Sequence, residues 1–321
     1  MKSSENAVVQ WGTDAWQLWD QFWFTPRLPH TLAIIRILCG AMMVYLHLIW
    51  AAFVTDFMGA TAWIDNATIW QIHAQDFAWS WLWYFESPTI LFLHQLLAIL
   101  FSAAMMLGLA TRFAIPLAWL FTIMTCHRLT GALFGLDQIV VMLTMYLMIA
   151  PCGSVYSIDA LLRERRGAYW WLPKNEPSVL SNVATRFIQL HLCVIYLFGG
   201  LGKMRGEMWW DGSALWYSIV NYEYQSLDLT WLGRFPFIIA TLTATTLFWE
   251  TFYCALVWPR ITRPLVLIMA VLVHGGIAVA LGMVTFGTIM VVANGAFIQP
   301  EVTRRWVEFI SRYKTGVARR E

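Results

Sequence analysis

Residues 88–110 of the chain form the stretch PTILFLHQLLAILFSAAMMLGLA, which contains no Asp, Glu, Lys or Arg. A helix of about 20 apolar residues is long enough to cross a hydrocarbon core of about 30 Å. Apolar runs of this length are unusual in water-soluble folds. The stretch therefore predicts a transmembrane helix.

The composition extends this conclusion to the whole chain. Of the 321 residues, 59% are hydrophobic, only 12% are charged, and 20 are tryptophans. Such a chain cannot be arranged as a soluble globule. We predict an all-α polytopic membrane protein, a bundle of about eight transmembrane helices (seven or eight), because the last two spans are short enough to form a re-entrant hairpin. The predicted spans are 32–53, 88–110, 113–130, 136–152, 184–203, 235–257, 264–283 and 284–299.

A cleavable signal peptide has a basic start followed by an apolar core. The N-terminal residues do not show this pattern. Residues 10–25 instead place Trp16, Trp19 and Trp23 on one helical face. This pattern predicts a helix that lies in the membrane interface or packs on the bundle. We divide the chain into an N-terminal tail with an interfacial amphipathic helix (1–31), a transmembrane domain (32–300) and a basic cytoplasmic tail (301–321).

Charge placement predicts the orientation, because cytoplasmic loops are richer in Lys and Arg. With the N-terminus inside, the inner segments hold 16 of the 21 Lys and Arg residues. The others are Arg36 within the first span, and Arg128, Lys203, Arg205 and Arg234 in the outer segments. Both termini are therefore predicted to be cytoplasmic and Lys203 extracytoplasmic. In a bacterium, the membrane would be the cytoplasmic (inner) membrane.

The five cysteines, Cys39, Cys126, Cys152, Cys193 and Cys254, lie in or beside the spans without a CxxC pair. We predict no metal site and no disulfide framework from this pattern. The expected partner is the lipid bilayer, and we expect no nucleic acid. The sequence specifies no protein substrate.

Ionisable residues inside a membrane are costly, so each one is a candidate for a site. Arg36 lies about one turn inside the inner end of the first span, and Glu250 lies about two turns from the inner end of the sixth. Because their depths are similar, we predict a structural Arg36–Glu250 ion pair or a shared polar network.

A second polar group gathers toward the predicted outer side, around the end of the fifth span. Helical spacing places Lys203, Gly199 and Tyr196 along one stripe, with Gln189 near the same face. Gly199 carries no side chain, which lets another helix or a flat ligand approach the backbone. A lysine buried there could act as a base near neutral pH. The alternative is a lysine whose stem covers apolar surface while its ammonium reaches water.

Two more polar residues lie in the middle of the last two spans. His274 stands beside Gly275 and Gly276, and Asn294 lies in the final span. At this depth, a histidine is either a hydrogen-bonded packing residue or a proton-transfer or ligand-binding group. We therefore include His274 and Asn294, with Tyr196 and Gly199, as candidate ligand-binding residues.

Three stretches carry a family resemblance. They are LAIIRILCG, the segment that runs from GLATRFAIP through the histidine of TCHRLTG to YSIDALL, and QLHLCVIYLFGGLGKMRGEMWWDGSAL. Together they resemble the membrane domain shared by the vitamin K-dependent gamma-glutamyl carboxylase and the HTTM (horizontally transferred transmembrane domain) family. The resemblance covers most of residues 25–300.

This resemblance implies a function for several candidates. It implies that Lys203 is the base that deprotonates a reduced, vitamin K-like quinone, as the lysine of the Gly-x-x-Lys element does in the carboxylase. It also implies a catalytic role for His127 and a place for His274 in the cavity. The large lumenal portion that holds the carboxylase's protein substrate has no counterpart here, and Gly202 replaces one of its paired lysines.

Three functional hypotheses follow. The first is a quinol-dependent enzyme with carboxylase-like (lyase) or oxidase-like chemistry, in which Lys203 is the base at an outward-facing cavity. The second is a membrane module that binds a quinone or a lipid, where the same lysine neutralises a head group. The third is a non-catalytic subunit of a membrane complex. An inverted repeat, which would be expected of many transporters, is not evident in the sequence.

Overall fold

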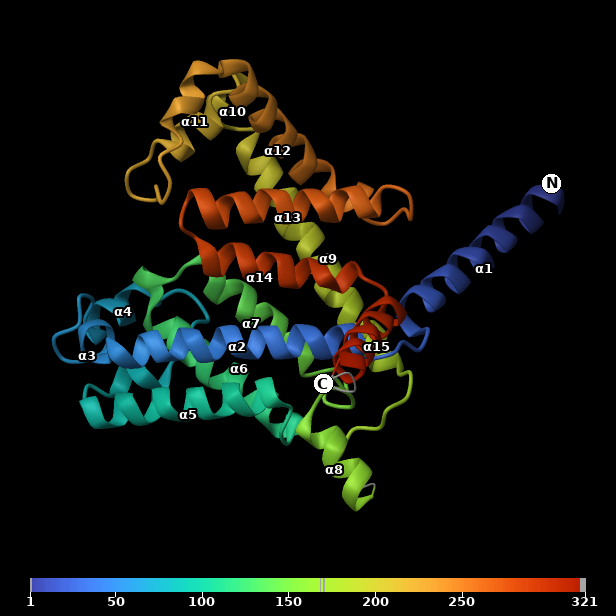
Figure 1. Cartoon of the computed structure of the whole chain (residues 1–321), viewed down its shortest axis with the longest axis horizontal. Coiled ribbons are helices and arrows are strands. Elements are labelled where there is room, and N and C mark those ends of the chain that lie inside the picture. Colours follow the sequence, from blue (N-terminus) through green and yellow to red (C-terminus); the bar gives the residue numbers. More distant parts are fainter. Residues whose placement is uncertain (1, 168, 170, 318–321) are drawn as a thin grey trace.

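The structure is a computed structural model that describes residues 2–167, 169 and 171–317. Within these residues the regular structure is helical (Figure 1). Every predicted span coincides with a helix: α2 (His30–Ala52), α5 (Pro88–Leu107), α6 (Thr111–Arg128), α7 (Gly135–Leu147), α9 (Val179–Lys203), α12 (Pro236–Leu256), α13 (Arg263–Ala280) and α14 (Val284–Asn294). The prediction of an all-α polytopic membrane protein is confirmed.

The bundle helices differ in length. Five of them, α2, α5, α9, α12 and α13, are long and apolar enough to cross a membrane. The shorter α7 and α14 have 13 and 11 residues, and helices of that size span about 20 Å or less. The helices α13 and α14 lie side by side (Figure 1) and are joined by a tight turn in which Gly282 has a φ of 69°. The last two predicted spans therefore form a helical hairpin.

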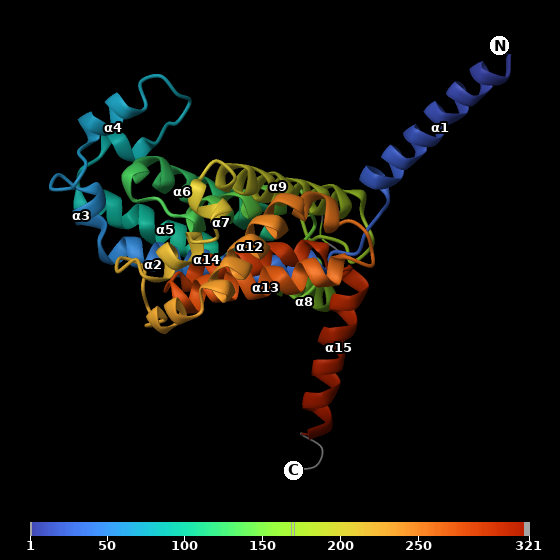
Figure 2. The same cartoon turned by 90° about the horizontal axis from the view of Figure 1, so that it is seen from above.

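Further helices lie at the two ends of the bundle. Figures 1 and 2 place α3 and α4 at one end, and α1, α8 and α15 at the other. The helices α1 and α15 therefore leave the bundle at the same end. The bounds are α1 (Lys2–Phe24), α3 (Val54–Met58), α4 (Asn66–Ile72), α8 (Ile158–Arg166), α10 (Glu207–Trp210), α11 (Ala214–Ile219) and α15 (Pro300–Val317), with 3-10 turns η1 (Trp81–Tyr84), η2 (Thr130–Ala132), η3 (Thr230–Arg234) and η4 (Gly295–Phe297).

The helix α1 projects away from the bundle in both views. Trp16 and Trp19 are exposed along it. Its last turn is fixed to the bundle, because Asn182 and Arg186 of α9 donate hydrogen bonds to the carbonyl oxygen of Phe22. A helix thus occupies the predicted region, and its exposed tryptophans suit the expected location in the membrane interface.

The helix α2 packs against α5, α7 and α14, while α9 packs along α12. A Cβ on Gly200 of α9 would lie 2.8 Å from the Cα of Thr251 on α12, so only glycine permits this approach. Outward-facing side chains such as Phe248, Leu265 and Leu272 are exposed and apolar. The bundle therefore has a close-packed interior and an apolar outer surface suited to lipid.

Arg36 is fully buried, and the predicted Arg36–Glu250 ion pair is wrong. The Arg36 guanidinium donates instead to the backbone carbonyl oxygens of Met105, Met106, Cys152 and Tyr156. Two of these carbonyls belong to the last turn of α5, where a cation is favourable because helix C-termini carry unpaired acceptors. Arg36 thus ties α2 to the end of α5 and to the loop before α8.

Asp159 completes this junction from the other side. Its carboxylate accepts hydrogen bonds from the backbone N–H of Ala110 at 2.7 Å, and from the N–H and hydroxyl of Thr111 at 2.8 and 2.7 Å. These are the free donors at the start of α6, which a carboxylate satisfies well. The sequence segments around Arg36 and Asp159 therefore have a structural role. They join α2, the end of α5 and the start of α6 to the segment that leads into α8.

We expect Asp159→Asn to lower the free energy of unfolding by about 2–4 kcal/mol, because an amide NH₂ would face backbone donors in a fully buried place. The measurement is thermal unfolding of the detergent-purified protein. Asp211→Asn is the control, because Asp211 accepts a similar bond from the N–H of Ser213 but is exposed. Equal unfolding temperatures for the two variants would contradict the role given to Asp159.

Candidate functional site

Lys203 is the last residue of α9, and its ammonium forms an ion pair with Glu250 of α12. The Nζ–Oε2 distance is 2.5 Å, and the side chains are 29% and 11% exposed. The same Nζ lies 5.4 Å from the centre of the Trp209 ring, a cation–π contact. Lys203 is therefore held by a carboxylate and an aromatic ring. A lysine whose ammonium only reached for water would need neither contact.

The alignment of α9 and α12 sets the position of this pair along the bundle. Gly200 meets Thr251, and Tyr196 lies against Tyr253, so the two helices run antiparallel. Glu250 is six residues from the end of α12, about 9 Å along its axis. The first half of α12 extends past the end of α9 and packs against α10 and α11. Lys203 thus lies beside the second half of α12 and not at its first turn.

Glycines leave the surroundings of the pair open. A Cβ on Gly199 would meet only Glu250 Oε2 at 3.4 Å and Lys203 Nζ at 3.9 Å, and a Cβ on Gly202 would meet nothing within 4 Å. The residue pattern on α9 had predicted that Gly199 would adjoin Lys203, and it does. Gly199 therefore leaves the ion pair without a covering side chain on that side, and Gly202 adds no side chain to the end of α9.

Three of the predicted ligand-binding residues meet in one hydrogen-bonded cluster. Tyr253 donates to Asn294 Oδ1 at 2.6 Å, Asn294 Nδ2 donates to the Tyr196 hydroxyl at 2.8 Å, and that hydroxyl lies 2.7 Å from His274 Nε2. The cluster joins α9, α12, α13 and α14. The sequence had not indicated Tyr253, which looked like an ordinary aromatic residue of an apolar helix. Its hydroxyl makes it part of the cluster.

The donors in this cluster fix the direction of its hydrogen bonds. The Tyr196 oxygen accepts from Asn294, so a hydrogen bond from its own proton to His274 Nε2 would satisfy both groups. The neutral His274 ring then carries its proton on Nδ1, and this buried nitrogen has no hydrogen-bond partner among the described residues. The chain of hydrogen bonds therefore ends in a free donor.

Aromatic packing connects the cluster with the ion pair. The Tyr196 ring lies 4.9 Å from the ring of Trp249 and 4.0 Å from that of Tyr253, residues one before and three after Glu250 on α12. Tyr196 and Lys203 are seven residues apart on α9, about 10 Å along the helix. Gln189, further along the same stripe, is also buried and donates to the carbonyl oxygen of Ala296. The predicted polar stripe of α9 does face the bundle interior.

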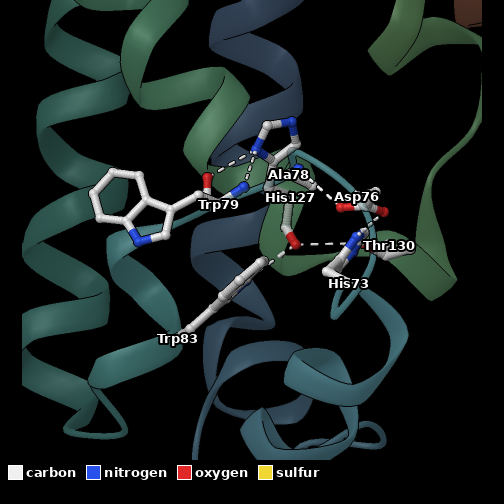
Figure 3. A network of polar contacts seen from close by, with 7 residues as sticks. All are labelled: His73, Asp76, Ala78, Trp79, Trp83, His127 and Thr130. Atoms are coloured by element: carbon white, nitrogen blue, oxygen red, sulfur yellow. Dashed lines mark hydrogen bonds and ion pairs between the residues drawn. The ribbon is translucent and has the colours of Figure 1, made fainter.

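His127 lies elsewhere, at the end of α6 (Figure 3). Its Nδ1 is 2.8 Å from the carbonyl oxygen of Trp79 and 3.2 Å from the N–H of the same residue. None of the hydrogen bonds and ion pairs formed by the described residues joins His127 to Lys203. The structure therefore does not bring the two predicted catalytic residues into one site.

The surroundings of His127 contain a second polar group that the sequence had not indicated. His73 Nδ1 lies 2.7 Å from Asp76 Oδ2, and its Nε2 lies 2.6 Å from the Thr130 hydroxyl (Figure 3). The bond from His73 holds the pKa of Asp76 below its ordinary value. The stability that this bond provides is present at neutral pH and is lost as the pH falls through the lowered pKa. These contacts fasten the loop after α4 to the turn after α6.

Two buried histidines form a further polar group between α2, α5 and α6. His47 bonds Gln95 at 2.8 Å and Thr122 at 2.9 Å, and His94 bonds Thr125 at 3.0 Å. The criterion that had singled out His274, a polar side chain in an apolar span, would also have found His47 and His94. No three or more His, Cys, Asp or Glu side chains of the described residues are grouped so that they could hold a metal ion.

Two proteins of Bacillus subtilis (strain 168) are similar to the chain. Sporulation-delaying protein SdpB is 26% identical over 179 residues, which are 51% of this chain and 55% of SdpB. Uncharacterized protein YitO is 29% identical over 109 residues, 32% of this chain and 35% of YitO. The chain thus spans about half the length of the first relative and about a third of the second. No family model and no solved structure matches it.

Proposed function

We propose that this integral membrane protein is an acid–base enzyme that removes a proton from a hydroxyl group of a reduced, quinone-like lipid. The observation that carries the proposal is the Lys203–Glu250 pair, held between two apolar helices beside Gly199. The family resemblance supports the same choice of lysine. The charge distribution of the loops supports an opening of this site toward the extracytoplasmic side.

The carboxylate explains how a charged lysine can serve as a base. When a ligand displaces water, the ion pair loses solvation, and transfer of the Lys203 proton to Glu250 leaves two neutral groups. The free amine then accepts the proton of a substrate hydroxyl. Lys203 becomes an ammonium again, next to the oxygen anion that it has produced, and stabilises that charge. Glu250 retains the first proton until the site reopens.

The neighbouring residues offer contacts to a flat ring that carries oxygen atoms. Gly199 and Gly202 leave space for a flat group, and Trp209 offers an aromatic face beside Lys203. His274 Nδ1 is a donor without a partner among the described residues, suited to a quinone or hydroxyl oxygen. Tyr196 and Asn294 would hold the His274 ring in this orientation. A bound quinol would supply the acidic hydroxyl groups, while the protein supplies the base and the orientation.

A second candidate is a module that binds a quinone or a lipid without turnover. It is favoured by the close Lys203–Glu250 contact, because a lysine neutralised by a carboxylate can hold a ligand oxygen without accepting its proton. The two candidates share the same ligand class, and they differ in whether the ligand is consumed.

Ligand retention tests both candidates. We expect a quinone to co-purify with the wild-type protein in native lipids, and mass spectrometry to show at least about tenfold less of it with Lys203→Ala, a loss of about 1.4 kcal/mol in binding. Arg205→Ala is the control, because Arg205 is an exposed cation two residues away. Equal quinone content in wild type and Lys203→Ala, or none in either, would remove the support for a quinone site at Lys203.

A further inference from the structure

The C-terminal helix α15 is strongly amphipathic. The exposed apolar residues Val302, Trp306, Phe309, Ile310 and Tyr313 follow one another at helical spacing and form a single stripe. Figure 2 shows α15 running across the direction of the bundle helices, away from their end. A helix with this stripe and this direction is suited to lie on the membrane surface, with its apolar side in the lipid.

The other side of α15 faces a cavity of about 1010 Å³. The helix contributes Arg304, Glu308 and Arg312 to its lining, and α8 contributes Arg163 and Glu164. The lining thus contains three arginines and two glutamates. Of these, Arg304 forms an ion pair with Glu308 at 3.5 Å. The rest of the lining includes leucine, isoleucine and valine side chains. The cavity is therefore amphipathic, with an excess of positive charge, at the level of the surface helix.

Two buried polar side chains line this cavity without a complete set of partners. Ser154 is 0% exposed and His30 is 7% exposed. Neither Ser154 Oγ nor His30 Nδ1 has a hydrogen-bond partner among the described residues. Buried polar atoms are rarely left unpaired, so Ser154 and His30 each retain the capacity for one more hydrogen bond at the wall of the cavity. Arg163 also donates to the carbonyl oxygen of Ser154 at 3.0 Å, which holds its guanidinium at the same place.

We propose that this cavity binds the phosphate head group of an anionic phospholipid. Arg163 and Arg304 attract the phosphate, since the guanidinium group matches its oxygens in charge and geometry. Ser154 and His30 can turn toward the head group and add hydrogen bonds to it, and the apolar lining takes the first carbons of the acyl chains. The stripe of α15 holds the helix in the same leaflet. Basic pockets at this level are a common means of recognising acidic lipids.

Native mass spectrometry of the purified full-length protein tests this proposal, with phosphatidylglycerol and phosphatidylcholine added in turn. We expect phosphatidylglycerol to be retained preferentially, and Arg163→Gln or Arg304→Gln to weaken its binding about fivefold each. The matched controls are Arg165→Gln on α8 and Arg305→Gln on α15, which remove the same charge from exposed positions outside the lining. Arg304→Gln is the decisive variant if Arg163→Gln fails to fold, because Arg163 also supports the backbone.

Each outcome of the experiment decides the proposal. Weaker binding in the two lining variants and unchanged binding in the two controls would support it. Equal weakening in all four would show attraction by overall charge alone and overturn it. Equal retention of phosphatidylcholine would exclude selection of an anionic lipid. Displacement of the lipid by millimolar glycerol phosphate would assign the cavity to a soluble phosphate compound instead.

Discussion

Arg36→Met is expected to destabilise the protein more than any other single substitution in the bundle, by about 3–5 kcal/mol. The methionine fills much of the same volume but donates no hydrogen bond. The carbonyl oxygens of Met105, Met106, Cys152 and Tyr156 would then be left without their donor in a buried place. Thermal unfolding in detergent, followed by the loss of helical circular dichroism, measures the effect.

Two further variants make the result specific to Arg36. Arg36→Lys should recover only part of the stability, because one ammonium cannot reach four carbonyl groups in different directions. Leu38→Met, an exposed and apolar position on the same helix, should leave the unfolding temperature nearly unchanged. If Arg36→Met unfolded at the same temperature as Leu38→Met, Arg36 would not hold this junction of helices together.

Separating Lys203 from Glu250 is expected to have the second largest effect on stability. Lys203→Met or Glu250→Leu would each leave one charge without its partner inside the bundle, at a cost of about 3–5 kcal/mol for a fully buried pair and less here because Lys203 is partly exposed. The double variant Lys203→Met/Glu250→Leu leaves no such charge, so it should be more stable than the sum of the single effects predicts.

A second pair in the chain is a control for this cycle. Lys174 and Glu176 lie 3.9 Å apart, and their side chains are 78% and 63% exposed. Exposed pairs of this kind contribute little, so the same cycle at Lys174 and Glu176 should show no measurable coupling. If the coupling at Lys203 and Glu250 were equally absent, the pair would not be a functional unit in the folded protein.

The sequence predicted the helices well because most of the apolar runs are long and are bounded by charged, aromatic or glycine residues. It also predicted the shared face of Tyr196, Gly199 and Lys203, since helical spacing within one helix is regular. Which helices are neighbours is not encoded in that spacing. Depth in the membrane suggested Arg36 as the partner of Glu250, but α12 packs along α9, and this brings Lys203 to Glu250 instead.

The position of Lys203 shows a second limit of sequence reasoning. A lysine at the end of an apolar run was expected near the membrane surface, where one helix end normally lies. The structure ends α9 beside the second half of α12, and α10 and α11 follow beyond it. This position of Lys203 follows from the packing of α9 along α12, whose first half extends past the end of α9. The candidate cluster of Tyr196, His274 and Asn294 could be named from the sequence, whereas Tyr253 and the partner of Lys203 could not.

The central claim is that Lys203 and Glu250 together remove a proton from a quinol-like substrate. Consumption of a reduced naphthoquinol in air by the protein in nanodiscs tests it most directly, after subtraction of the spontaneous oxidation. We predict that the wild type accelerates consumption, that Lys203→Ala and Glu250→Gln each slow it by at least about 100-fold, and that Arg205→Ala does not. Unchanged turnover in folded Lys203→Ala would contradict the claim.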